Sequence, residues 1–389
     1  MNSQNTPVHI RLWHHDFWRL SVANLLLTMA VYMLVPTMPL WLINLGFSWM
    51  ETGIAMGAFG IGLFVLGGFV SFLVQHYRRN MVCIWSAACM AALLGLSYYF
   101  ETRISQLPFY VVVLQRLLFG VVFGLAQMVL TSTLIIDTSE SYQRTEANHS
   151  ASWFGRLALS LGPIAGILTE QLAGFGIVLL SAACLSFIAV VLIFLVHFPF
   201  RAPQDDVPTF SLDRFFLPHG FPLFFNLQLI MLAAGLLFSM SLTIHFYTMM
   251  MAGFLSALLA QRFIFRDAEV KSEVVTGLIL MGAALLMMLT RTQQIVVYAA
   301  PLFIGFALGI IGARFLLFFI KLSRHCQRGT SQSTFMLGWE SGIAWGIGIG
   351  YALLHAEEKY ILPVALTFVV LALVMYNFTH DWFVRNKNR

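Results

Sequence analysis

Long apolar runs alternate with short polar breaks along the whole chain. Each run is close to the ~20 residues that an α-helix needs to cross a bilayer. The runs lack the period-two alternation that is typical of an outer-membrane barrel. The pattern therefore predicts an all-α polytopic membrane protein, with twelve spans at approximately 17–43, 50–74, 81–100, 108–136, 148–170, 176–198, 221–239, 244–264, 274–290, 295–320, 333–354 and 361–379.

The longest polar break, Pro199 to Gly220, divides the chain near its middle. We expect an N-terminal six-helix bundle at 1–198, a cytoplasmic linker at 199–220 and a C-terminal six-helix bundle at 221–389. The two halves resemble each other, and parallel six-helix repeats are a transporter architecture. The matching positions are Gly68 with Gly253, Arg116 with Arg314, Trp153 with Trp339, and Gly162 with Gly348.

Composition agrees with a membrane location, because 59% of the residues are hydrophobic and only 10% are charged. A soluble domain carries roughly 25% charged residues. Most Lys and Arg residues lie on the side of the predicted spans that holds both termini. This bias predicts that both termini are cytoplasmic and that the protein lies in the cytoplasmic (inner) membrane. The net charge of +5 therefore calls for no nucleic acid partner.

Two arginines lie in the middle of predicted spans, in similar neighbourhoods. Arg116 is followed by Leu-Leu-Phe and Arg314 by Phe-Leu-Leu-Phe. A guanidinium keeps its charge in proteins, and a charge near the bilayer centre costs a few kcal/mol, roughly. Such a residue is by default a transport-pathway candidate. The alternative is a structural arginine that pairs with carbonyl groups and a carboxylate inside the bundle.

Three stretches resemble signatures of the major facilitator superfamily, particularly its proton-coupled efflux branch. Leu114-Gln-Arg116-Leu-Leu-Phe-Gly120 is similar to the fourth-span signature, whose Arg the family ties to proton movement. The fifth span resembles the antiporter signature through Gly162, Pro163 and Gly166. The loop after the second span resembles the basic gating signature. In that loop Gln75, where the family usually has Asp, precedes Arg78 and Arg79.

Glu340 is the carboxylate that the predicted limits place well inside a span. It is a candidate proton carrier, and the alternative is a fixed ion-pair partner for Arg314 or Arg156. Asp137, at the end of the fourth span, is the second candidate. Three intramembrane arginines against one glutamate favour a substrate that brings negative charge, because uncompensated buried charge is expensive. The predicted substrate-binding residues are Asn24, Arg116, Arg156, Asn226, Arg314 and Trp339.

The resulting hypothesis is a secondary transporter of a small amphipathic organic solute, coupled to protons and exporting by alternating access. The alternative is a transport-inactive membrane sensor or scaffold with the same fold. The weak basic loop favours it, as does the tight turn predicted near Ser239 to His245 between the short seventh and eighth spans. No nucleotide loop, zinc spacing or catalytic triad is visible, so we expect no enzyme, cofactor or metal site. We expect a monomer.

Overall fold

The computed structural model describes residues 12–103, 107–140, 142–198, 204, 206–265 and 269–387. Regular structure within these ranges is entirely helical. The elements are α1 (His15–Tyr32), α2 (Leu34–Asn44), α3 (Trp49–Val65), η1 (Gly67–Phe69), α4 (Val70–His76), α5 (Arg79–Arg103), α6 (Phe109–Val129), η2 (Leu130–Leu134), α7 (Ile135–Asp137), α8 (Arg144–Ala173), α9 (Phe175–Phe194), η3 (Pro218–Gly220), α10 (Phe221–Phe238), α11 (Ile244–Phe263), α12 (Val270–Thr290), α13 (Gln294–Leu322), η4 (His325–Gln327), α14 (Arg328–Ala352) and α15 (Glu358–Asn386).

Several neighbouring elements join into single long rods, such as residues 15–44, 49–76 and 109–137. Among the described residues, 11 helical segments are long and apolar enough to cross a membrane. The 25-residue α14 is a further long helix. It is rich in Gly and Ser and contains Glu340, so its composition is less apolar although nearly all of it is buried. The predicted all-α polytopic fold is therefore confirmed.

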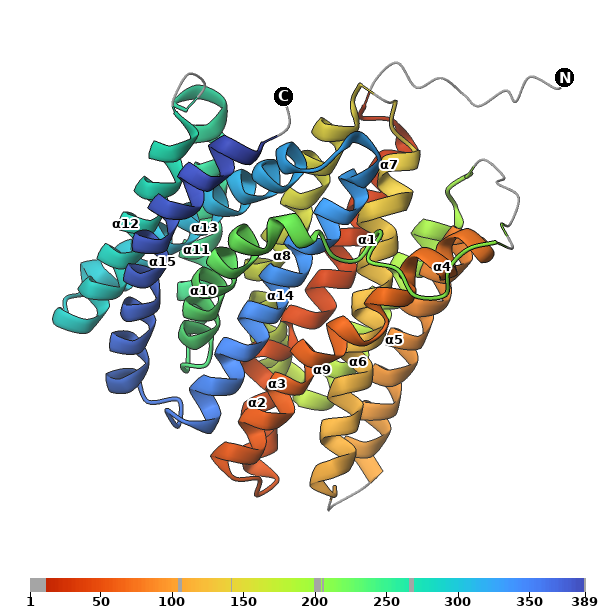
Figure 1. The fold of residues 1–389 in the computed structure, drawn as a ribbon. Helices are drawn as coiled ribbons and strands as arrows, with labels where there is room; N and C mark the ends of the chain where they lie inside the picture. The colour runs from red at the N-terminus through yellow and green to blue at the C-terminus, as the bar shows by residue number, and fades with distance from the viewer. Residues whose placement is uncertain are drawn as a thin grey trace, which may run out of the picture.

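Both described chain ends lie at the same end of the molecule, which we call the terminal end (Figure 1). We call the other end, where α3 and α15 begin, the opposite end. Helices α1 to α9 form the first half of the chain and α10 to α15 the second. In the middle of the molecule α14 packs on both α3 and α10 (Figure 1). This central place explains why α14 needs little apolar surface toward lipid.

Small residues allow the closest helix contacts between the halves. At the opposite end, a Cβ atom on Gly53 of α3 would lie 2.4 Å from the Gly348 carbonyl oxygen of α14. Near the terminal end, a Cβ atom on Gly329 would lie 2.6 Å from the Ser132 carbonyl oxygen of η2. Glycine is needed where backbones approach this closely. The halves therefore touch near both ends of the molecule.

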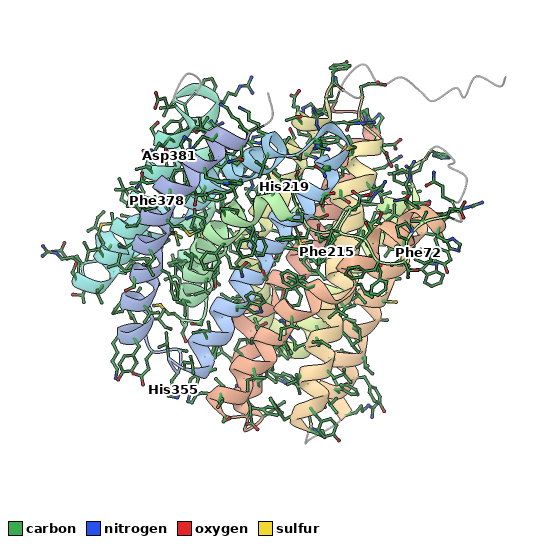
Figure 2. All side chains as sticks on the ribbon, viewed as in Figure 1. Phe72, Phe215, His219, His355, Phe378 and Asp381 are labelled. Carbon is green, nitrogen blue, oxygen red and sulfur yellow. The ribbon has the colours of Figure 1, made fainter. Side chains whose placement is uncertain are left out.

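Large apolar side chains cover the outer faces. Trp85 on α5 is 64% exposed, and Phe378 on α15, labelled in Figure 2, is 74% exposed. Exposed apolar surface of this extent marks a face that contacts something other than water. In a helix bundle with membrane-length rods, these faces are the lipid-facing surface.

Local sequence signals account for several helix limits. Ser48 and Glu51 form a capping box that starts α3, in which the Ser48 hydroxyl accepts from the Glu51 amide and the Glu51 carboxylate accepts from the Ser48 amide. Such boxes satisfy amide groups that a helix start would leave unpaired. Gly174, with φ of 84°, separates α8 from α9 at a conformation that favours glycine.

The predicted limits agree with the observed helices except at a few ends. The connection between α10 and α11, residues 239–243, is short, which confirms the predicted tight turn. Helix α12 begins at Val270, four residues before the predicted limit of 274. Glu273 is consequently helical and fully buried. In the predicted linker, residues 199–203 and 205 lie outside the described residues, whereas 206–217 run along the terminal end.

Candidate functional site

A hydrogen-bonded pair joins the two halves in the middle of the molecule. The Tyr32 hydroxyl at the end of α1 donates to the Glu340 carboxylate of α14, with its oxygen 3.0 Å from Oε1 and 2.9 Å from Oε2. Tyr32 is 1% exposed and Glu340 is 7% exposed. Buried polar groups need such partners. Glu340 is thus held by a tyrosine, and not by Arg314 or Arg156 as the ion-pair alternative required.

The glycines of the fifth-span signature position Tyr32. A Cβ atom on Gly162 of α8 would lie 2.6 Å from the Tyr32 Cβ atom, and one on Gly166 would lie 2.4 Å from the Met33 carbonyl oxygen. Helix α8 can therefore lie directly against α1 at the level of the Tyr32–Glu340 pair. Pro163, inside α8, removes one backbone donor from this helix.

On one side of Glu340 lies a partly open cavity, with about 400 Å³ of space that includes open solvent at its mouth. Helix α1 contributes Asn24 and Thr28, and α14 contributes Trp339 and Glu340. The Asn24 amide donates to the Ala151 carbonyl at 3.0 Å, which fixes its orientation. The remaining lining residues are Gln127, Thr131, Ser152, Gly155, Arg156, Gln332, Phe335 and Met336. An amide-rich wall with aromatic faces suits an organic ligand with few polar groups.

Arg156 borders this cavity, but its guanidinium is largely occupied by protein groups. Nη2 donates to the Ser152 hydroxyl at 2.7 Å, Nε to the Ser152 carbonyl at 3.2 Å, and Nη1 to the Gly309 carbonyl of α13 at 3.1 Å. Its central carbon lies 4.1 Å from the centroid of the Trp153 ring. Arg156 therefore joins α8 to the second half and gives the cavity wall a fixed positive charge.

On the other side of Glu340 lies a second, partly open cavity, with about 300 Å³ of space that includes open solvent, and Arg116 lines it. Arg116 is 3% exposed. Its Nε and Nη1 have no hydrogen-bond partner among the described residues. The guanidinium carbon lies 5.2 Å from the Phe59 ring centroid and 5.5 Å from that of Phe119. The other lining residues are Val31, Tyr32, Val35, Met56, Glu340, Ile343, Ala344 and Ile347.

A buried guanidinium without hydrogen-bond acceptors is costly, because desolvation is not offset by a partner. Its contacts with aromatic faces offset part of this, since cation–π contacts are worth roughly 0.5–2 kcal/mol. A ligand oxygen would satisfy the remaining donors. Arg116 is for this reason a candidate anion-binding group of the second cavity.

Arg314 lies elsewhere, and the expectation that it matches Arg116 in position is wrong. Arg116 lies seven residues after α6 begins at Phe109, whereas Arg314 lies twenty residues after α13 begins at Gln294. The helical rise of 1.5 Å per residue separates the two levels by about 20 Å. Arg314 Nε lies 2.6 Å from Glu273 Oε2 of α12, and Arg314 lines neither cavity.

Two further candidates lie outside the cavities. Asn226 on α10 donates to the Ala372 carbonyl of α15 at 2.9 Å, which is a helix-packing contact. Asp137 forms a buried ion pair with Arg79 at the terminal end. It therefore stands apart from Glu340, the other proton-carrier candidate. Asn226 thus joins two helices of the second half, and Asp137 joins two helices of the first half.

The basic loop keeps a polar network without its usual Asp. The Gln75 amide donates to the Ser71 hydroxyl at 2.7 Å. Ser71 in turn donates to Asp213 of the linker at 3.3 Å. Arg78 is exposed at the terminal surface. The acidic group at this place thus comes from the linker.

Comparison with known proteins decides the family. The sequence profile of the Major Facilitator Superfamily matches residues 20–347, which is most of the chain. The chain belongs to the Major Facilitator Superfamily. No curated protein sequence is significantly similar to it.

Solved transporter structures have the same fold as this superfamily member. The human organic anion transporter MFSD10 (TETRAN) superposes with a TM-score of 0.69 at 14% identity, over 93% of this chain and 99% of that one. A bacterial homologue of the human lysosomal transporter Spinster, in an inward-facing and occupied conformation, superposes with a TM-score of 0.68 at 12% identity, over 96% of this chain and 98% of that one. A variant of the nucleoside transporter NupG superposes with a TM-score of 0.64 at 15% identity, over 94% of this chain and 99% of that one. At such identities the likeness concerns the fold.

Sequence reasoning missed two partners in this superfamily member. Tyr32 is not among the predicted site residues, because nothing in the sequence pairs it with Glu340, 308 positions away. Glu273 was placed outside its span. The sequence did offer a signal for this pair. Glu273 directly precedes an apolar run, and the next predicted span contains Arg314 without an acidic partner of its own.

Proposed function

We propose that this protein is a secondary active transporter that moves a small amphipathic organic solute across the membrane by alternating access. The observation that carries the proposal is the pair of cavities on either side of Glu340. They are lined by residues of both halves, and one contains a buried guanidinium with unpaired donors. Two six-helix bundles at 1–198 and 221–389 would rock about these cavities, with 199–220 as linker.

The charge of the lining favours an anionic substrate. Arg116 and Arg156 bring two positive charges, and Glu340 brings at most one negative charge. An acidic group on the substrate would accept from the Arg116 donors. The substrate body would lie against apolar residues such as Val35 and Ile343.

Proton coupling is the second element of the proposal, with Glu340 as the proton carrier. A carboxyl group exchanges a proton, and a tyrosine hydroxyl can hydrogen-bond to it in either state. Glu340 lines both cavities, so its charge acts on any ligand in either. Asp137 is the weaker candidate because Arg79 neutralises it at a distance from the cavities.

Export is proposed because the run around Gly162 and Pro163 resembles the antiporter signature. We propose that both termini face the cytoplasm, that the membrane is the inner membrane and that the monomer is the working unit. The bias of basic residues supports this orientation.

A flux screen in proteoliposomes with an imposed pH gradient tests the function. The panel should hold amphipathic carboxylates, with uncharged amides and amines of matched shape as controls. We expect gradient-dependent movement of a carboxylate, and its loss in Arg116→Ala with near-normal folding. Arg116→Lys should restore little, because a point charge does not replace a planar fork. Full-rate transport by Arg116→Ala would make Arg116 structural, and no flux of any solute would favour the sensor or scaffold.

A further inference from the structure

The described part of the linker lies across the terminal end and contacts the first half through three elements. The Ser211 amide donates to the Gly68 carbonyl of η1 at 2.8 Å. Asp213 Oδ2 accepts from the Ser71 hydroxyl of α4 at 3.3 Å. The Arg214 guanidinium donates to the Thr133 hydroxyl of η2 at 3.0 Å. We call residues 210–217 the strap.

The strap binds the second half through the first turns of α14. The Thr330 hydroxyl donates to Asp213 Oδ1 at 3.0 Å, and it accepts from the Arg214 amide at 2.8 Å. The Thr334 hydroxyl accepts from the Leu217 amide at 2.8 Å. Both threonines are buried. The Asp213 carboxylate thus joins the halves directly, with one oxygen bonded to each.

Two aromatic rings anchor the strap where α3 bends into α4. A Cβ atom on Gly67 would lie 1.9 Å from a Phe215 ring carbon, and one on Gly68 would lie 2.2 Å from a Phe210 ring carbon. With any larger residue at these two positions the rings would have to move. In the view of Figure 2, Phe215 lies near the centre of the picture, where the linker passes from one half to the other. These glycines are accordingly part of the strap's docking site.

The strap backbone itself is held in an uncommon conformation. Arg214 has a φ of 59°, a left-handed backbone value that residues other than Gly, Asn and Asp rarely adopt. Its amide and its guanidinium bond to opposite halves of the protein. Such a conformation persists when the surroundings over-determine it.

We propose that the strap is a latch, centred on Asp213, that holds the terminal end closed and must release when the cavities open to that side. The inference rests on the proposed alternating access. Opening there requires α14 to part from η2, which it touches at Gly329 and Ser132. The strap spans this junction with three bonds to each half, so its three bonds to one of the halves must break when the gap widens. Asp213 is a positioning residue for the gate and contacts no substrate.

Distance measurement between spin labels tests the latch without any substrate. Labels at Tyr77→Cys and Arg324→Cys, both exposed positions, report the separation of the halves at the terminal end in lipid nanodiscs. The four native cysteines are first replaced. Asp213→Ala removes both acceptors, and we expect the population at long distance to rise about tenfold, since each lost bond involves a charged group. Asp206→Ala, an exposed position in the same linker, is the charge-matched control.

Thr330→Val removes the partner on α14 without changing the linker, and it should shift the distances in the same direction. It also carries the test if Asp213→Ala fails to fold. The latch is refuted if Asp213→Ala and Thr330→Val give the same distances as Asp206→Ala. Absence of solute flux with an intact distance shift would instead refute the proposed transport and leave the latch standing.

Discussion

The Tyr32–Glu340 bond should be measurable as a coupling free energy. Tyr32→Phe removes one hydroxyl and keeps the Cβ atom that packs against Gly162. The same change leaves Glu340 without the hydrogen-bond partner that the structure gives it. A hydrogen bond to a charged group contributes about 1.5–3 kcal/mol, against about 0.5–1.5 kcal/mol for a neutral pair. Glu340→Gln replaces the charged acceptor by a neutral amide of similar shape.

A double-mutant cycle isolates this term. Unfolding free energies of wild type, Tyr32→Phe, Glu340→Gln and the double variant would be measured by denaturant titration in mixed micelles. We expect a coupling of about 1 kcal/mol when Glu340 is ionised, because the Tyr32 hydroxyl keeps a neutral hydrogen bond to Gln in the single variant. Thr28→Val, at another polar position of α1, combined with Glu340→Gln is a suitable control cycle. A Tyr32–Glu340 coupling below about 0.3 kcal/mol, within ordinary additivity error, would refute the bond.

Two other predictions concern helix packing. Glu273→Gln leaves Arg314 without its ionised partner and should lower the free energy of unfolding by about 3 kcal/mol, which is the low end for buried pairs because Arg314 keeps some exposure. Flux per folded molecule should stay near the wild-type value. Strongly reduced flux with normal stability would instead place Arg314 in the transport pathway. Gly162→Ala should destabilise the protein by roughly 1–3 kcal/mol through overpacking against Tyr32, and it should slow flux. Gly95→Ala is the control, because nothing lies near its Cβ position. Equal melting temperatures of the two variants would contradict the packing argument.

The helices were predictable because bilayer-length apolar runs leave few alternatives. The tight turn after α10 also followed from counting residues between two spans. The start of α12 did not, because hydropathy marks where apolar residues begin and not where backbone hydrogen bonds begin. The four-residue difference concealed Glu273 inside the helix. The buried partner of Arg314 was missed for that reason.

The site was only partly predictable, because depth and facing depend on packing between distant helices. Asn24, Arg116, Arg156, Trp339 and Glu340 line the cavities, whereas Asn226, Arg314 and Asp137 do not. Repeat matching assigned Arg314 by its neighbouring residue types, and it ignored the residue count from the helix start. The Asp213 contacts likewise depend on where a non-helical segment folds back, which periodicity does not record.

Uptake and release by proteoliposomes under an imposed pH gradient test the central claim most directly, with wild type compared to Glu340→Gln. The solute is the carboxylate of the panel that wild type moves fastest. We predict that Glu340→Gln still binds and exchanges this solute but no longer accumulates it against its gradient, because the amide cannot carry a proton. Gradient-driven accumulation that survives in folded Glu340→Gln would contradict the account of Glu340 as the proton carrier.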